Sequence, residues 1–231
     1  MLRHSVLFLW KDTTTELEKL IALKGLAYLS YASPSAQAVD FGTDLNGGST
    51  RLREVKPWER TPLWHARKSG PPCNFDMALH LDFDDVAGLD AYNSNDAHHE
   101  VSVYHERICR DEFTGRVDWF YGGPSRIERF GVRHTSLFLW LDDTADSRKN
   151  DVRDAFISLQ SSIPGVKSII TGDNVGKSTT GYDLIVDVML DDRESAKAYL
   201  EHEGQLEALS LAAAATKYEW TARITHPMAS G

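Results

Sequence analysis

The chain of 231 residues lacks several features that would assign it to a class of protein at once. It has no apolar run of membrane-spanning length, and its apolar segment 7–10 is too short for the core of a signal peptide. The net charge is −9 at pH 7, and no cluster of lysine and arginine is present to neutralise phosphates. We therefore expect a cytoplasmic protein whose partners include neither a membrane nor a nucleic acid.

Cysteine and the common cofactor motifs are also scarce. The two cysteines, Cys73 and Cys109, do not form a CxxC pair, so we interpret them as reduced thiols. The histidines are not spaced as metal ligands. Segment 172–178 contains glycine and lysine, but it lacks the GxxxxGK[ST] spacing of a phosphate-binding loop. The sequence thus predicts neither a metal nor a cofactor.

What the chain does contain is an internal repeat. RHSVLFLW at residues 3–10 returns as RHTSLFLW at residues 133–140. Segments 75–82 and 182–189 also resemble each other, and each continues through Asp-Asp to Ala-Tyr. Because the patterned segments recur in the same order, the chain is expected to hold two copies of one supersecondary unit.

Each copy is predicted to fold as β-α-β-β-α-β, the ferredoxin-like arrangement. Its first strand is apolar on both faces, which is typical of a strand covered on two sides. A sheet with helices on one face leaves its other face uncovered, and two such faces can pack together. We expect an α+β protein with two ferredoxin-like units, at 1–125 and 130–231, packed sheet to sheet as an intramolecular α+β barrel.

The predicted helices carry apolar stripes of the kind that pack on a core. In the helix expected at 13–29, this stripe consists of Leu17, Leu20, Ile21 and Tyr28. In the helix expected at 147–162, it consists of Val152, Phe156 and Leu159. In the last helix, it consists of Leu206, Leu209 and Ala213.

The two copies differ most in an insertion at residues 47–72, which only the first copy has. It contains Trp58 and Trp64. Loops of this length are usually functional or disordered, and two tryptophans argue against disorder. Two interpretations remain open: the insertion covers the mouth of the barrel as a lid, with a tryptophan touching the ligand, or it packs on the outer surface.

The repeated residues resemble a known family. A histidine in the first strand, then a strand, Asp-Asp and a helix with Ala-Tyr, followed by a histidine three or six residues on, is similar to the dimeric α+β barrel, or stress-responsive A/B barrel, domain. That family includes polyketide cyclases, cofactor-free monooxygenases and isomerases. The pattern most resembles its plant polyketide cyclases, which catalyse an intramolecular aldol condensation.

In the first copy, the resemblance places His4, Tyr92 and His98 at the positions of the cyclase site. Asn95 stands where the cyclases have a further histidine. Leu26 stands where they have a tyrosine on the first helix, so that contact is missing.

In the second copy, the resemblance points to His134, Tyr199 and His202. Gln205 replaces the last histidine, and Phe156 replaces the first-helix tyrosine. The first copy is therefore expected to hold the working pocket.

These residue types suit the removal of a proton next to a carbonyl group. A neutral imidazole is the usual base near neutral pH, and a phenol can donate a hydrogen bond to the oxygen where negative charge develops. We expect His98 to act as base or acid, His4 as its partner and Tyr92 as the donor. Because Tyr92 and His98 are six positions apart, they can converge only if the helix breaks near residues 94–96.

Other residues are expected to contact a small-molecule substrate: Phe8, Met77, Leu79, Trp58, Trp64, His134, Tyr199 and His202. Each site residue also has a plain structural interpretation. The first-strand histidines can be bonded to the backbone, the tyrosines can be core residues, and His98 can belong to a solvated helix start. We interpret His105 as core or surface, and His80 as a hydrogen-bonded residue on the helix side of the sheet.

The leading functional hypothesis is a cofactor-independent enzyme acting on a small carbonyl or phenolic, polyketide-like substrate, as a cyclase, lyase or isomerase. A cofactor-free monooxygenase is one alternative, and a non-catalytic stress-responsive ligand-binding protein is another. The insertion in only one half argues against the purely binding role. A homodimer of the whole chain is left open.

Overall fold

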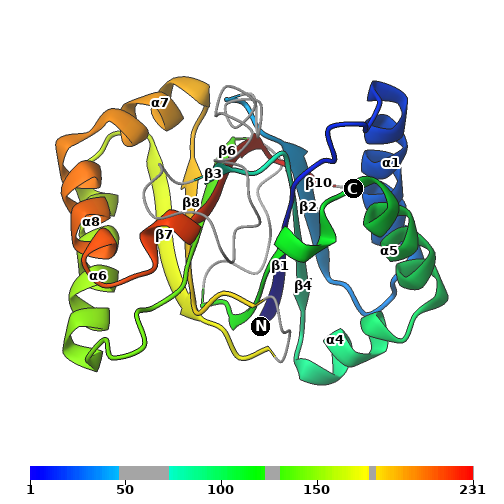
Figure 1. Cartoon of the computed structure of the whole chain (residues 1–231), viewed down its shortest axis with the longest axis horizontal. Coiled ribbons are helices and arrows are strands. Elements are labelled where there is room, and N and C mark those ends of the chain that lie inside the picture. The colour runs from blue at the N-terminus through cyan, green and yellow to red at the C-terminus, as the bar shows by residue number, and fades with distance from the viewer. Residues whose placement is uncertain (47–72, 123–130, 177–180, 231) are drawn as a thin grey trace.

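The computed structural model describes residues 1–46, 73–122, 131–176 and 181–230. It consists of two α+β units whose sheets face each other in the centre, with helices on the outer sides (Figure 1). The first unit contains β1 (Leu2–Phe8), α1 (Glu16–Ala32), β2 (Ala38–Thr43), β4 (Met77–Phe83), α4 (Val86–Asn93), α5 (Asp96–Ile108) and β5 (Gly115–Phe120). The second contains β6 (Val132–Phe138), α6 (Asp146–Ser158), β7 (Val166–Asp173), β8 (Leu184–Leu190), α7 (Arg193–Glu201), α8 (Glu203–Ala213) and β9 (Ala222–Pro227).

Each sheet has four antiparallel strands from its own unit and one short strand from the other unit. The strand orders are β10-β2-β4-β1-β5 and β3-β9-β6-β8-β7. Strand β10 (Ala229–Ser230), at the end of the chain, joins the first sheet, whereas β3 (Cys73–Asn74), from the first half, joins the second. This exchange ties the two units to each other. Within each unit, the order of its own four strands, β2-β4-β1-β5 and β9-β6-β8-β7, confirms the predicted ferredoxin-like arrangement.

The sheets also meet along both edges and close a barrel. On one side, the Leu45 amide donates to the Thr225 carbonyl over 2.6 Å. On the other side, the Val175 amide donates to the Asp118 carbonyl over 2.7 Å. Because exposed strand edges are thereby paired, the two units form the single closed barrel expected from the sequence.

The apolar core has layers on both faces of each sheet. Side chains alternate along β1, so Val6 and Phe8 pack with the helices of the first unit. Leu7 packs instead between the two sheets, in a cluster that includes Leu137 and Ile185 of the second unit. Each unit therefore has its own helix-side core and shares a second core with its neighbour.

The apolar stripe predicted for α1 is wrong. Its four residues are between 43% and 66% exposed: Leu17, Leu20, Ile21 and Tyr28. The buried residues of the helix are Ala22, Leu26 and Leu29. Because α1 is apolar around most of its circumference, periodicity alone does not select the packed face.

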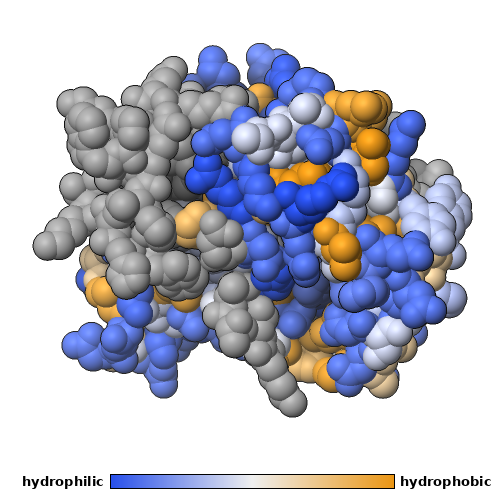
Figure 2. All heavy atoms as spheres, turned by 45° about the vertical axis from the view of Figure 1, so that its right-hand side comes forward, coloured by the Kyte–Doolittle hydropathy of each residue, from blue (hydrophilic) through white to orange (hydrophobic). Residues whose placement is uncertain are grey.

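The surface shown in Figure 2 is mixed in character. On this side of the molecule, hydrophobic side chains form separate patches within a largely hydrophilic surface.

The other two stripes have different outcomes. In α6 and the 3₁₀ turn after it, Val152, Phe156 and Leu159 are buried as predicted. In α8 the prediction is wrong, because Leu206 is 56% exposed and the buried residues are Gln205, Ala208 and Ala212. Among the helices that the structure describes, none is long and apolar enough to cross a membrane.

Candidate active site

A break between α4 and α5 brings Tyr92 and His98 together. Helix α4 ends at Asn93, and Asn95 then begins α5 by accepting a hydrogen bond from the Ala97 amide over 2.8 Å. Across this turn, the rings of Tyr92 and His98 have centroids 4.2 Å apart. The break predicted at residues 94–96 is confirmed, and it provides the convergence that an unbroken helix would prevent.

His4 approaches the same two rings from β1. Its ring centroid lies 6.1 Å from that of Tyr92. Its Nδ1 lies 2.5 Å from Oδ1 of Asp118, the residue directly opposite on β5. A carboxylate accepts hydrogen bonds, so Nδ1 is the donor in this contact, and Nε2 is the ring nitrogen that Asp118 does not hold. Asp118 therefore orients His4.

Asp118 was missed by the sequence analysis. Its significance depends on the register between β1 and β5, which pairs His4 with Asp118. This register becomes known only from the folded sheet.

Burial shifts the pKa values of His98 and Tyr92 in opposite directions. Burial lowers the pKa of the His98 imidazole, and the nearby His4 lowers it further, while a hydrogen bond to the Asn93 backbone opposes both. Burial raises the pKa of the Tyr92 phenol above its ordinary value. Near neutral pH the site therefore holds a neutral imidazole able to accept a proton and a phenol able to donate a hydrogen bond.

These groups line a cavity of about 60 Å³ between the sheet and the helices of the first unit. Phe8 and Leu79, two of the residues expected to contact a substrate, line it as well. Met77 is buried in the adjoining apolar core and is not a lining residue. A volume of this size holds at most a few water molecules. The cavity as it stands accepts only a small ligand or the reacting end of a larger one.

Four residues line both this cavity and a neighbouring one of about 40 Å³: Phe8, Ser102, His105 and Arg116. His105 donates from Nδ1 to the Val101 carbonyl over 2.8 Å, and its buried Nε2 has no hydrogen-bond partner among the described residues. Burial lowers its pKa, so the ring is a neutral acceptor. Arg116 donates to Asp111 over 2.8 Å. The sequence predicted His105 to be a core or surface residue and gave no signal for Arg116.

The second unit keeps the same positions with different chemistry. His134 Nδ1 lies 2.9 Å from Thr225 Oγ1, and its Nε2 lies 3.1 Å from Ser136 Oγ. Thr225 stands opposite His134 on the neighbouring strand, where the first unit has Asp118. Burial lowers the pKa of His134 to about 3, so the ring is neutral. Its centroid lies 5.8 Å from that of Tyr199.

A cavity of about 500 Å³ lies beside His134. Gln205, at the position of His98, lines it too. Tyr199 is buried beside Gln205. Burial raises the pKa of the Tyr199 phenol, and the nearby Gln205 side chain partly offsets that increase. His202 is not a lining residue, because its Nδ1 caps α8 by accepting from the Gly204 amide over 3.1 Å.

The insertion at 47–72, with Trp58 and Trp64, lies outside the described residues. Its two neighbours in the chain are placed, however. Asn46, directly before it, and Asn74, shortly after it, both line the cavity of the second unit. The described chain on both sides of the insertion therefore lies at the cavity of the second unit.

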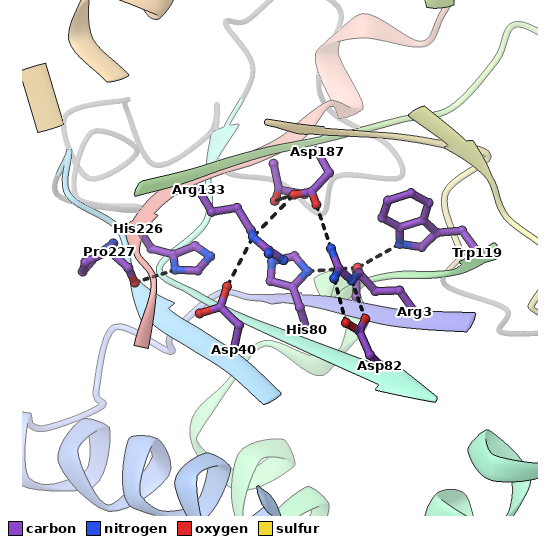
Figure 3. A network of polar contacts seen from close by, with 11 residues as sticks. Arg3, Asp40, His80, Asp82, Trp119, Arg133, Asp187, His226 and Pro227 are labelled. Carbon is purple, nitrogen blue, oxygen red and sulfur yellow. Dashed lines mark hydrogen bonds and ion pairs between the residues drawn. The ribbon is translucent and has the colours of Figure 1, made fainter. Parts of the chain in front are cut away.

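The interior of the barrel contains a third group of polar residues, separate from both cavities (Figure 3). Arg3 donates two hydrogen bonds to Asp82, over 2.6 and 2.8 Å, and one to Asp187 of the second unit. Arg133 forms an ion pair with Asp40 of the first unit at 3.2 Å. These reciprocal contacts hold the units in register.

His80 belongs to this interior group. Its Nδ1 lies 3.0 Å from Ser5 Oγ, and its ring stacks on that of His226 with centroids 5.7 Å apart. The prediction that His80 lies on the helix side is wrong. Alternation along β4 (Met77–Phe83) puts Leu79 and Leu81 toward the helices and His80 toward the other sheet.

Comparisons with known proteins agree with this architecture. Residues 132–219 match the model of the Stress responsive A/B Barrel Domain family. This match lies within the second unit and agrees with the resemblance noted in the sequence. No curated protein matches the chain.

Several solved structures share the fold over nearly the whole chain. An anthrone oxidase-like protein is 11% identical, with a TM-score of 0.65 over 98% of this chain and 90% of that one. A provisionally assigned monooxygenase from Lactobacillus acidophilus NCFM is 11% identical, with a TM-score of 0.50 over 99% and 93% of the two chains. Another from Fusobacterium nucleatum is 8% identical, with a TM-score of 0.51 over 99% and 91%. At such identities the likeness shows the fold alone.

Proposed function

We propose that the protein is a cofactor-independent enzyme that performs acid–base chemistry on a small carbonyl or phenolic compound, as a cyclase, lyase or isomerase. One observation carries this proposal. His4, His98 and Tyr92 come from three different elements and line one cavity, and a carboxylate orients one of the two imidazoles. Perturbed titratable groups that converge on a cavity are typical of catalytic sites.

The proposed reaction begins with His98. Its neutral imidazole takes a proton from the carbon next to a carbonyl group, and the electron pair of that C–H bond moves onto the carbonyl oxygen to give an enolate. The Tyr92 hydroxyl donates a hydrogen bond to this oxygen, where the negative charge develops. Burial strengthens that interaction because little water competes with it.

The fate of the enolate separates the three reaction types. In an isomerase, the proton returns to another carbon. In a lyase, the electron pair expels a leaving group. In a cyclase, the enolate carbon attacks a second carbonyl carbon, whose oxygen takes a proton. We assign the second proton transfer to His98, which holds the abstracted proton after the first step. His4 is its partner in the site, with Nε2 as the ring nitrogen that Asp118 does not hold.

A cofactor-free monooxygenase is the second candidate. The same deprotonation, applied to an electron-rich phenol, gives an anion that can reduce molecular oxygen. The apolar lining supplied by Phe8 and Leu79 suits such a substrate. The names of two fold neighbours, an oxidase-like protein and a monooxygenase, point in the same direction, although these neighbours share only the fold.

The test is a screen of small 1,3-diketones and dihydric phenols with the whole chain, in which substrate loss and dissolved oxygen are followed together. Substrate conversion without oxygen uptake would support the leading proposal. Uptake of oxygen in proportion to product would support the monooxygenase instead. Saturable binding without conversion of any compound would contradict both and leave a ligand-binding protein.

A further inference from the structure

The second unit has the larger cavity, although it lacks most of the acid–base groups. Its volume of about 500 Å³ lies within the roughly 300–1,000 Å³ typical of small-molecule sites. Gln205 stands in the place of His98 and Thr225 in the place of Asp118. Both nitrogens of His134 are already bonded to hydroxyl groups. This cavity is therefore suited to holding a ligand and poorly suited to proton transfer.

Cations gather at the cavity despite the net charge of −9 of the chain. Arg193 and Lys197 lie one turn apart on α7 and are exposed, and Arg223 on β9 is half-buried. Asn74 Oδ1 accepts a hydrogen bond from Arg223 Nε over 2.7 Å, which holds the guanidinium in place. Glu201 is the only acidic group among the described lining residues. Such a local excess of positive charge attracts anions.

The rest of the lining provides a polar floor and an apolar wall. Thr221 is only 2% exposed, and its hydroxyl has no hydrogen-bond partner among the residues that the structure describes. Buried hydroxyl groups are normally bonded, so this one points to a polar group of a ligand. The apolar wall is supplied by Ala196, Leu200 and Leu209.

We propose that the cavity of the second unit binds a small organic carboxylate with an apolar body. The carboxylate lies toward Arg223, whose planar guanidinium can bind it through two parallel hydrogen bonds. The apolar body lies against Leu200 and Leu209, while Arg193 and Lys197 attract the anion at the mouth. The two units then divide the work, one holding an acid–base site and the other a binding site.

The experiment uses hexanoate as the probe and hexan-1-ol as its neutral counterpart of equal length, titrated into the whole chain by calorimetry. Hexanoate should bind at least tenfold more tightly than hexan-1-ol. Arg223→Gln should weaken hexanoate binding by about tenfold or more, as expected for the loss of a charged hydrogen-bonding partner. Arg148→Gln, an exposed arginine of the same unit that does not line the cavity, is the matched control and should leave binding unchanged.

Hexanoate binding no tighter than that of hexan-1-ol would overturn the proposal, and so would equal losses in the two arginine variants. If Arg223→Gln does not fold, as judged by thermal melting, the double variant Arg193→Gln/Lys197→Gln decides. Both of its side chains are exposed, so the fold should persist. A loss of severalfold in affinity supports the proposal, and unchanged affinity rejects it. His98→Ala should bind hexanoate normally, which separates this test from that of the catalytic proposal.

Discussion

Arg3 in β1 donates a hydrogen bond from Nη1 to Oδ2 of Asp187 in β8, over 3.0 Å, and so connects the two units at the centre of the barrel. Both side chains are 1% exposed. Arg3 also holds Asp82 of its own unit through two hydrogen bonds. A buried charge that loses its partner keeps its desolvation cost without the compensating attraction. The contact therefore has a measurable consequence for folding.

Replacing Arg3 by methionine should lower the free energy of unfolding by about 3–5 kcal/mol, because it leaves Asp82 and Asp187 buried without this partner. Urea unfolding at pH 7 measures the change. Lys149→Met removes an exposed pair with Asp146 and is the control, with an expected change of about 0.5 kcal/mol or less. Equal changes in the two variants would show that the interior contact adds nothing to stability.

His98→Ala should reduce turnover of any substrate found by the screen by roughly 10²–10⁴-fold, the usual contribution of a general acid–base group. Gln205→Ala alters the corresponding position of the second unit and should have a much smaller effect. Steady-state rates of the two variants provide the comparison. Equal losses would indicate two equivalent sites or none.

Asp118→Asn should also slow turnover, by less than His98→Ala, because His4 stays in place but is no longer oriented by a carboxylate. Proton NMR gives a second measurement that a general loss of packing would not mimic. The Nδ1 proton in the 2.5 Å contact should give a far-downfield signal, and this signal should disappear in the variant. A retained signal with unchanged kcat would contradict the role of Asp118.

His134 should make stability depend on pH. Burial lowers its pKa from 6.5 to about 3, so the folded state resists a proton that the unfolded state accepts. The stability from this neutral ring is fully present above pH 6.5 and is lost as the pH falls toward 3, by up to about 1.4 kcal/mol per pH unit. Urea unfolding at pH 7, 5.5 and 4.5 should show a shallower loss in His134→Gln than in the native chain. Parallel curves would rule out this contribution.

The packed face of α1 can be tested directly. Leu26→Ala should cost about 2–5 kcal/mol, since it leaves a cavity in the core of the first unit. Leu17→Ala changes an exposed position of the same helix and should cost about 0.5 kcal/mol or less. Thermal or urea unfolding distinguishes the two. Similar costs would mean that the exposed side of α1 is covered in solution.

Much of the local structure could be predicted from adjacent residues. The repeated RHSVLFLW and RHTSLFLW segments predicted the first strand of each unit, and β1 and β6 lie there. The turn-prone stretch at 94–96 predicted the helix break that brings Tyr92 to His98. Asp85 and Asp192 accept hydrogen bonds from amides three residues on, as helix-capping residues do. Such signals depend on neighbours in the chain, so a single sequence contains them.

What the sequence by itself determined was therefore the order of the elements, the doubled unit and which residues of the first copy are candidates for acid–base chemistry. The tertiary structure alone decided which side of α1 is buried, which of the two cavities is large, and that Arg3 bonds to Asp187. These features depend on contacts between residues far apart in the chain, and on the volume left between packed layers. Periodicity and capping describe only what lies within a few residues along the chain. These two signals therefore contain no information about long-range contacts or about the volume between packed layers.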